Sequence, residues 1–396
     1  MVNAADHNCT TRAARSERRR GRRRSEAAAT EIIRHLYVHI PFCARICPYC
    51  AFYTALLDRP ELPRFCKALL DELTQCAQDR HFAPSTIYFG GGTPTALSTS
   101  HLRMLLQGFH AQLDLSDLTE WTMEANPGSI SPRKAALLRE LGVNRISLGV
   151  QSWDSDLLAL LGREHSAAQA EQSFAIVRDA GFANINIDLM FGLPRQTIRQ
   201  WHKTLDKTIA LGPEHISAYC LTYEEDTDFF LRHARGEFRQ DSDSDAEFFE
   251  LTMSMLEAAG YQHYEISNYA PPEFQSVHNR AYWSGEDYVG IGPSAFSTAG
   301  LRRWQNVPNY SEYSARVLRG ASAVEAIEQL TPEMKRSESI ALGLRTREGI
   351  SADLVEGRQS QAGEFITLGL LQRRNGKLVL TPAGKSLADS IAEEFL

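Results

Sequence analysis

Residues 43–50 read CARICPYC and follow the apolar run LYVHIPF at residues 36–42. Three of the seven cysteines of the chain, Cys43, Cys47 and Cys50, stand within this short segment. A structural zinc site usually takes four ligands from two separated pairs, and this chain has no second C-x2-C pair. A four-iron cluster held by three thiolates leaves one iron free for an external ligand. The spacing therefore predicts an iron–sulfur cluster with one open coordination position.

The composition favours an intracellular protein without a membrane span. The chain has 396 residues and 43% apolar content, enough for a large core. Its cysteines crowd together, and no apolar signal peptide precedes them, which is typical of a reducing compartment. The longest apolar stretches are short and interrupted by charges. We therefore expect a cytoplasmic location.

The first 30 residues differ from the rest of the chain. They contain a dense run of arginines, RSERRRGRRR at residues 15–24, whereas the whole chain carries a formal charge of -7. Such a segment has little to bury and repels itself, so we expect residues 1–30 to form a disordered tail. An organellar transit peptide, a weak nucleic-acid patch and an over-extended start site are the alternatives.

From residue 36 onward, β-rich apolar runs alternate with amphipathic helical patterns. This alternation predicts an α/β fold in which a parallel sheet with right-handed crossovers forms either an open sheet or a partial (β/α)6 barrel. The expected strands are residues 36–40, 86–89, 121–124, 145–150, 185–190 and 215–220. The expected helices are residues 63–78, 100–113, 131–141, 154–178 in one or two pieces, and 198–210.

Polar or glycine-rich segments follow the expected strands. After the cysteine segment come GGGTPT at 90–95, EANPG at 124–128, GVQSWD at 149–154 and DLMFGLP at 188–194. Parallel strands place their carboxyl ends at one edge, where ligands bind in such folds. Glycines there admit a close approach of backbone to ligand, and carboxylates can pair with an ammonium group. One shared site above the strand ends is expected.

The chain divides into further segments after the expected barrel, which we assign to residues 31–225. Residues 226–309 are less regular, with DSDSDAE at 241–247 and an aromatic, polar region that we interpret as a lid or second substrate element. Residues 310–396 are expected to form a smaller helical, winged-helix-like domain with a hairpin at Asn375-Gly376. Because no basic recognition helix accompanies it, we favour a structural cap over DNA recognition.

The C-x3-C-x2-C motif after YVHIPF resembles that of the radical S-adenosylmethionine (SAM) superfamily. The resemblance implies a partial (β/α)6 barrel that holds a 4Fe-4S cluster, with SAM chelating the open iron through its amino and carboxylate groups. It also implies that an electron from the reduced cluster can cleave SAM to give a 5′-deoxyadenosyl radical. The protein would orient and shield these cofactors.

Other segments narrow the resemblance. GGGTPT, MEANPG, SLGVQSWD, LGREHS and NIDLMFGLPRQT resemble the branch that contains oxygen-independent coproporphyrinogen III dehydrogenase and the HemW-type heme chaperones. The likeness runs from about residue 34 to the C-terminus. It implies SAM contacts at Tyr37, Tyr49, Gly91, Gly92, Thr93, Glu124, Gln151, Arg163 and Asp188, and less closely at Cys220 and Phe296.

Two features favour the chaperones within that branch. The dehydrogenase pattern has a fourth cysteine where this chain has Phe52, as the chaperones do. The segment HNRAYW at 278–283 resembles the H-N-x-x-Y-W motif associated with heme binding in the chaperones. Imidazole is a common axial ligand of heme iron, and aromatic rings can lie against the macrocycle. The resemblance therefore implies heme contacts at His278, Asn279, Tyr282 and Trp283, within a heme- or substrate-binding extension.

We thus expect a heme chaperone that binds a 4Fe-4S cluster, SAM and heme and delivers heme to recipient respiratory proteins. Whether the chain is also an enzyme, and whether it forms a homodimer, is left open. The main alternative is a coproporphyrinogen III dehydrogenase that abstracts hydrogen from the propionate side chains. A nucleic-acid-binding regulator is a third alternative, against which the acidic body of the chain argues.

Overall fold

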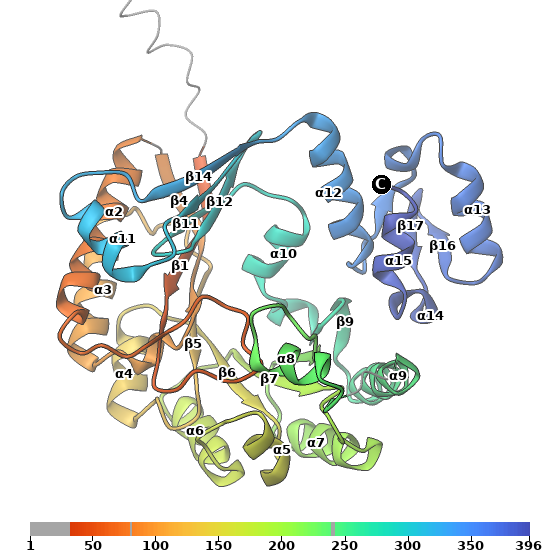
Figure 1. The fold of residues 1–396 in the computed structure, drawn as a ribbon, viewed down its shortest axis with the longest axis horizontal. Helices are drawn as coiled ribbons and strands as arrows, with labels where there is room; N and C mark the ends of the chain where they lie inside the picture. The colour runs from red at the N-terminus through yellow and green to blue at the C-terminus, as the bar shows by residue number, and fades with distance from the viewer. Residues whose placement is uncertain (1–31, 80, 239–241) are drawn as a thin grey trace, which may run out of the picture.

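The computed structural model describes residues 32–79, 81–238 and 242–396, so the expected disordered tail lies outside the described residues. Six parallel strands form the centre of the molecule in the order of the chain (Figure 1). Each pairs in parallel with the next, which confirms the α/β fold and the expected strands. They are β1 (Ile32–Ile40), β4 (His81–Gly91), β5 (Glu120–Ala125), β6 (Arg145–Gln151), β7 (Ile185–Phe191) and β8 (His215–Cys220).

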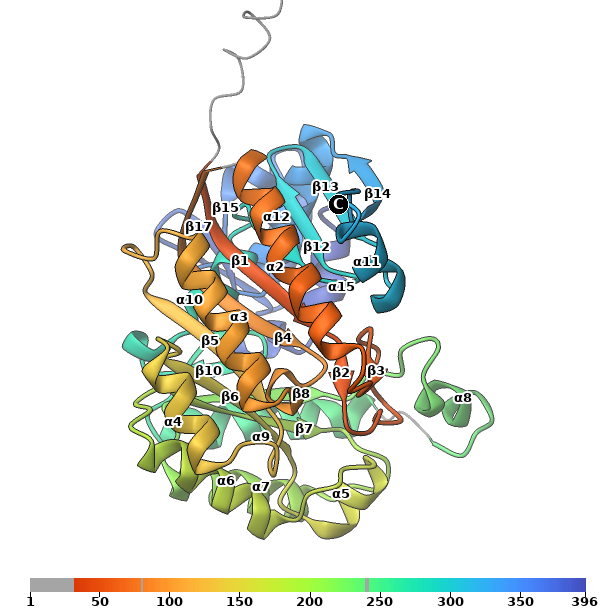
Figure 2. The same ribbon diagram turned by 90° about the vertical axis from the view of Figure 1, so that its left-hand side faces the viewer.

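Helices cover the outer face of this sheet (Figure 2). Ser166 and Thr197 form capping boxes that begin two of them. Segment 154–178, expected as one or two helices, forms two, and Gly162, with φ of 67°, lies in the break. The helices are α2 (Leu62–Asp79), α3 (Thr99–Gln112), α4 (Pro132–Glu140), α5 (Ser155–Leu160), α6 (Ala167–Asp179) and α7 (Ile198–Leu211).

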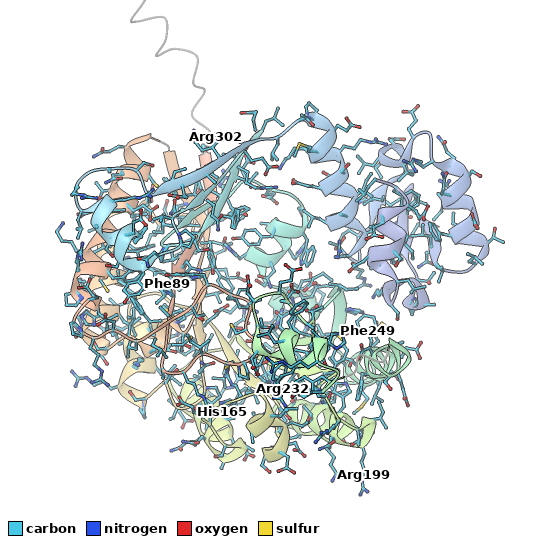
Figure 3. The ribbon with its side chains drawn as sticks, in the orientation of Figure 1. Phe89, His165, Arg199, Arg232, Phe249 and Arg302 are labelled. Carbon is cyan, nitrogen blue, oxygen red and sulfur yellow. The ribbon has the colours of Figure 1, made fainter. Side chains whose placement is uncertain are left out.

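The two faces of the strands differ in polarity. In β6, Ile146, Leu148 and Val150 are fully buried in the main core beneath the helices. Phe89 of β4, labelled in Figure 3, lies in the same core. Its ring centroid is 5.1 Å from that of Phe109 on α3. The intervening residues of β6, such as Ser147, face a cavity on the inner side. This alternation gives the barrel an apolar outside and a polar inside.

Residues 226–309 extend the sheet at both of its edges. Strand β11 (Val289–Ile291) pairs in parallel with β1. Strand β10 (Asn268–Ala270) pairs antiparallel with β8, and β9 (Gln262–Glu265) pairs antiparallel with β10, to give a nine-stranded sheet. Residues 226–309 therefore add strands to the barrel sheet, whether or not they also act as the expected lid or second substrate element.

The acidic part of this segment is more regular than its sequence suggested. Residues 242–258 form helix α9 (Ser242–Ala258), and a short helix α8 (Asp228–Ala234) precedes it. Phe248, Met253 and Leu256 are buried in the main core at helical spacing. The expectation of a less regular segment was wrong here because the apolar residues that follow DSDSDAE bury one face of a helix against the main core.

A second sheet lies beside the barrel. It is antiparallel and contains β12 (Phe296–Ala299), β13 (Arg302–Asn306) and β14 (Val324–Gln329). Helix α11 (Tyr310–Val317) packs on α2, where the Tyr313 hydroxyl donates to Glu72 Oε2 at 2.5 Å. Tyr313, Val317 and Ala323 are buried in the main core, so this part of the chain packs with the barrel.

The remaining chain has a hydrophobic cluster of its own, with Ile340, Leu344 and Leu378 at its centre. Asn375 and Gly376 both have positive φ, 52° and 78°, as a two-residue hairpin turn requires. The expected hairpin and helices are confirmed. The elements are α12 (Pro332–Leu344), β15 (Ile350–Ser351), α13 (Gln359–Thr367), β16 (Leu371–Arg374), β17 (Lys377–Leu380), α14 (Pro382–Lys385) and α15 (Ala388–Glu393).

None of the helices in the described ranges is long and apolar enough to cross a membrane.

Candidate functional site

The cysteine loop is anchored at both of its ends. Strand β2 (Phe42–Cys43) pairs in parallel with β3 (Ala55–Leu56), so residues 44–54 form a closed loop beside the strand ends. Cys43 is buried with its Sγ 3.5 Å from Thr93 Oγ1, whereas Cys47 and Cys50 are half-buried. All three are free thiols. Burial raises the pKa of Cys43, and it raises the pKa of Cys50 to about 11.

A cavity of about 460 Å³ lies between this loop and the carboxyl ends of the strands. The structure brings most of the expected ligand-binding residues to this one cavity, although they come from distant parts of the chain. Those that line it are Cys43, Cys47, Tyr49, Cys50, Gly91, Gly92, Glu124, Gln151, Arg163, Asp188 and Cys220.

Three expected contact residues do not line this cavity. Tyr37 is inside the barrel, where its hydroxyl is 3.1 Å from His39 Nδ1. Thr93 is buried behind the cysteine loop and accepts a hydrogen bond from Asn126 Nδ2 at 2.8 Å. Phe296 is 46% exposed at the start of β12. Direct SAM contacts at these three positions stay predictions.

Two carboxylates face the cavity from neighbouring parts of the sheet. Glu124 accepts hydrogen bonds from the Tyr88 hydroxyl at 2.8 Å and from the Gly91 amide at 3.1 Å. Burial raises the pKa of Glu124 to about 7, and burial also raises the pKa of Asp188. Asp188 accepts from Ser147 Oγ at 2.9 Å. Both groups are therefore held in fixed positions with oxygen atoms available to a cationic or hydroxylated ligand.

Arg163 is fixed beside the cysteines by a residue that the sequence interpretation missed. Its Nη2 donates to Asn126 Oδ1 and to Gly149 O, each at 2.6 Å. Its Nη1 lies 3.7 Å from Cys47 Sγ. Asn126 also donates to Thr93, so it links Arg163 to the wall behind Cys43. The signal for Asn126 was its place in EANPG at a strand end.

Gln151 has an unusual backbone conformation at the end of β6. Its φ is 66°, a left-handed value that is uncommon for a residue other than glycine. Its side-chain Oε1 is buried without a hydrogen-bond partner among the described residues. At Gly149, a Cβ atom would come within 3.0 Å of Asn126 Oδ1 and 3.1 Å of Gln151 Nε2. The absence of a side chain at Gly149 therefore lets the side chains of Asn126 and Gln151 pack against the end of β6.

The segment HNRAYW forms most of helix α10 (Val277–Trp283), and its N-terminus is fixed to the barrel. Glu120 of β5 accepts from the amides of Val277 at 2.9 Å and His278 at 3.1 Å. His278 is 1% exposed, and its ring stacks on Tyr88 with centroids 5.1 Å apart. Burial, with smaller contributions from His35 and Arg145, lowers the pKa of His278 to about 3.

The other three residues with expected heme contacts face a second cavity of about 300 Å³. Asn279, Tyr282 and Trp283 line it, together with β8, β9, β10 and Leu342 of α12. Tyr219 of β8 lines both this cavity and the cavity beside the cysteines. The two cavities are therefore neighbours that share one side chain.

In the described part of the chain, no group of three or more His, Cys, Asp or Glu side chains is arranged to hold a single metal ion. The three thiols of the loop border the same cavity. A four-iron cluster takes each thiolate on a different iron, so it does not need all three on a single metal ion.

Comparison with known proteins agrees with this arrangement. Residues 37–208 match the Radical SAM superfamily. The heme chaperone HemW of Lactococcus lactis is 36% identical over 372 residues, which cover 91% of this chain and 96% of the relative. The heme chaperones HemW of Bacillus subtilis and Escherichia coli are each 35% identical, and the matches cover 91% of this chain and 98% and 97% of those relatives.

Among solved structures, coproporphyrinogen III oxidase HemN of Escherichia coli has a TM-score of 0.78 to this chain. The sequence identity is 23%, and the match covers 92% of this chain and 90% of that chain. This likeness confirms the fold. The sequence relatives identify the branch, and the chain therefore belongs to the radical SAM superfamily and, within it, to the family of the HemW heme chaperones.

Proposed function

We propose that this protein is a heme chaperone that carries a 4Fe-4S cluster and SAM beside its cysteine loop, binds heme at helix α10 and passes heme to recipient respiratory proteins. The observation that carries the proposal is the contact between the two cavities. Tyr219 lines both the cysteine cavity and the cavity of the HNRAYW helix. A cofactor in the first cavity and a porphyrin in the second would therefore meet across one side chain.

The donor set of the loop fits an iron–sulfur cluster. Cys43, Cys47 and Cys50 are free, and all three border the same cavity. Phe52, which stands where a fourth cysteine would stand, is 71% exposed and offers no ligand atom. The Arg163 guanidinium beside Cys47 supplies a positive charge next to the thiolates. Bound there with SAM, a reduced cluster would supply one-electron chemistry.

The opposite wall fits SAM. Glu124 and Asp188 provide oxygen atoms for an ammonium group or for ribose hydroxyls. Gln151 also lines the cavity and adds a side-chain amide to this wall. The absence of a Cβ at Gly149 leaves room for the Asn126, Gln151 and Arg163 side chains that line this wall. These residues bind and orient the ligand, while Tyr49 and the apolar part of the loop exclude water.

Heme is the cargo in this proposal. Asn279, Tyr282 and Trp283 line the second cavity, with two aromatic rings that can lie against a macrocycle. His278 is covered by Tyr282, whose ring centroid is 4.7 Å away. Because Tyr282 also lines the cavity, displacement of its ring would open the imidazole to a porphyrin iron. Binding therefore requires this one side chain to move.

The location and the recipients follow from the same proposal. Delivery to respiratory proteins suits a cytoplasmic carrier, and the relatives named above are HemW heme chaperones. The alternative, coproporphyrinogen III dehydrogenase activity, is disfavoured by Phe52 in place of a fourth cysteine. Recognition of nucleic acid is disfavoured by the net negative charge of the chain.

The test is a hemin titration of protein with a reconstituted cluster under anaerobic conditions. We expect a Soret band that saturates at one hemin per chain, and an affinity at least about tenfold weaker in His278→Ala. His202→Ala is the matched control, because His202 is a half-exposed histidine on α7. Uptake that is absent, or unchanged in His278→Ala, would contradict the proposed heme role.

A second arm addresses the dehydrogenase. The same protein is incubated with dithionite, SAM and coproporphyrinogen III, and the porphyrinogens are separated by chromatography. We expect no protoporphyrinogen. Its formation at a catalytic rate would make the protein an enzyme of porphyrin synthesis.

A further inference from the structure

A chain of hydrogen bonds leads from the protein surface to the buried ring of His278. Glu286 Oε2, on a side chain that is 55% exposed, lies 3.1 Å from His35 Nε2. His35 Nδ1 lies 2.9 Å from Thr86 Oγ1, and Thr86 Oγ1 lies 2.8 Å from His278 Nδ1. The four residues come from β1, β4 and the segment that contains α10, so the tertiary fold assembles the chain.

The chemistry of each group gives this chain a direction. A carboxylate only accepts hydrogen bonds, so His35 Nε2 carries the proton that Glu286 receives. In neutral His35 the other nitrogen, Nδ1, is then an acceptor, and the Thr86 hydroxyl donates to it. The Thr86 oxygen remains free to accept from His278 Nδ1–H. The last nitrogen, His278 Nε2, is left with a lone pair.

The surroundings of His278 Nε2 agree with this direction. The atom is buried and has no hydrogen-bond partner among the described residues. The reverse direction would place a proton on it and bury an N–H donor without an acceptor, which is rarer in proteins than an unpaired acceptor. The ring of Tyr88 stacks on the imidazole and holds its plane, whereas Tyr282 covers it at a tilt.

We infer that Glu286, His35 and Thr86 are positioning residues that hold His278 as the Nδ1–H tautomer and present its Nε2 lone pair as a ligand for the iron of a porphyrin. This inference rests on the proposed heme role of His278. A second hydrogen-bond partner of this kind fixes the orientation of a metal-binding imidazole and raises its basicity. None of these three residues belongs to the HNRAYW motif.

The first experiment measures the tautomer without any metal. Protein with ¹⁵N-labelled histidine is examined by long-range ¹H–¹⁵N correlation, and the His278 signals are assigned from their loss in His278→Gln. We expect Nε2 to be unprotonated in the native protein. In Thr86→Val, which keeps the shape of the side chain but removes the hydroxyl, we expect a clear population of the Nε2–H tautomer. Thr86→Ser should restore the native spectrum.

The second experiment measures hemin affinity and the reduction potential of the hemin complex. We expect Thr86→Val to weaken hemin binding by about 10-fold or more and to raise the potential, and Glu286→Gln to act in the same direction with a smaller effect. Glu286 is exposed, so its variant does not threaten folding. Thr252→Val is the matched control, because Thr252 is a buried threonine on α9 whose hydroxyl also binds a ring N–H, that of Trp201.

The outcomes separate the two hypotheses. An unchanged tautomer and unchanged hemin affinity in Thr86→Val, with binding lost in His278→Ala, would overturn the inference and leave the heme role standing. Equal weakening in Thr252→Val would also overturn it, because the effect would then reflect general destabilisation. Normal hemin binding in His278→Ala would instead refute the heme role, while the metal-free spectra would still decide whether the three residues set the tautomer.

Discussion

Tyr88 and His278 stack with ring centroids 5.1 Å apart and an interplanar angle of 26°. The hydroxyl of the same Tyr88 donates to Glu124 Oε1 at 2.8 Å. One side chain on β4 thus contacts the HNRAYW helix through its ring and the wall of the cysteine cavity through its oxygen. A substitution that removes the hydroxyl and keeps the ring can therefore test the two contacts separately.

We predict that Tyr88→Phe lowers SAM affinity and leaves hemin affinity unchanged. The substitution removes a hydrogen bond that orients Glu124, and such bonds to charged groups contribute about 1.5–3 kcal/mol. It keeps the ring that stacks on His278. Equilibrium dialysis of SAM and hemin titration, both with the cluster reconstituted, measure the two effects. Tyr261→Phe is the control, since its buried hydroxyl donates to Pro213 O away from both cavities. Equal loss of both ligands would contradict the separation.

We predict that Gln151→Gly stabilises the metal-free protein and weakens SAM binding. A non-glycine residue with φ of 66° costs on the order of 1 kcal/mol or more, and glycine removes that cost. The same substitution deletes the side chain of Gln151, which lines the cavity. Urea unfolding and SAM dialysis measure the two changes. Asn375→Gly, at another positive φ in the hairpin of the C-terminal unit, should leave SAM binding as it is. Stronger SAM binding in Gln151→Gly would refute the role.

The sequence was sufficient to predict the sheet and most of the cysteine cavity. Strands such as β6 alternate apolar and polar residues and end in a recognisable segment, so their order and the shared edge follow from local pattern. The hydrogen bonds that join Arg163 to Thr93 could not be predicted from the sequence. Asn126 makes both contacts only because the fold brings these residues together, and no local pattern distinguishes it from other asparagines.

The burial of His278 could not be predicted from the sequence either. A motif defines which residues lie on one helix, but Glu120 of β5 determines where that helix begins and which way its first turn faces. Neither the Glu120 contact nor the Thr86 contact has a signature in the local pattern, since each joins residues more than 150 positions apart. Contacts of this kind depend on tertiary packing alone.

We predict that Glu72→Gln reduces the pH dependence of stability. Glu72 is buried between α2, α11 and β13, and burial raises its pKa to about 7 from 4.5. Between these values the native state keeps a proton that the unfolded state has released, so the free energy of unfolding falls as pH rises through this window. The contribution is on the order of 1–3 kcal/mol, and the variant lacks it.

Urea unfolding of the metal-free protein at about pH 5 and pH 8 measures this effect. The histidines whose pKa is lowered by burial, such as His39, act in the opposite direction. They are present in both proteins and cancel in the comparison. A native-minus-variant difference that is the same at both pH values would show that Glu72 does not titrate in this window.

We predict that Leu378→Ala loosens the C-terminal unit and leaves the barrel intact. Leu378 of β17 is fully buried in the cluster that contains Ile340 and Leu344, which is separate from the main core. Removal of a buried leucine side chain costs about 2–5 kcal/mol. Hydrogen exchange followed by mass spectrometry should show lost protection in peptides from residues 332–396 and native protection in β1 and β4–β8. Leu368→Ala, at a 62% exposed position of the same unit, is the control and should change neither region. Loss of protection in the barrel strands as well would contradict the prediction, because it would mean that the two cores unfold together. Leu342, which lines the second cavity, would then have the same local stability as the barrel.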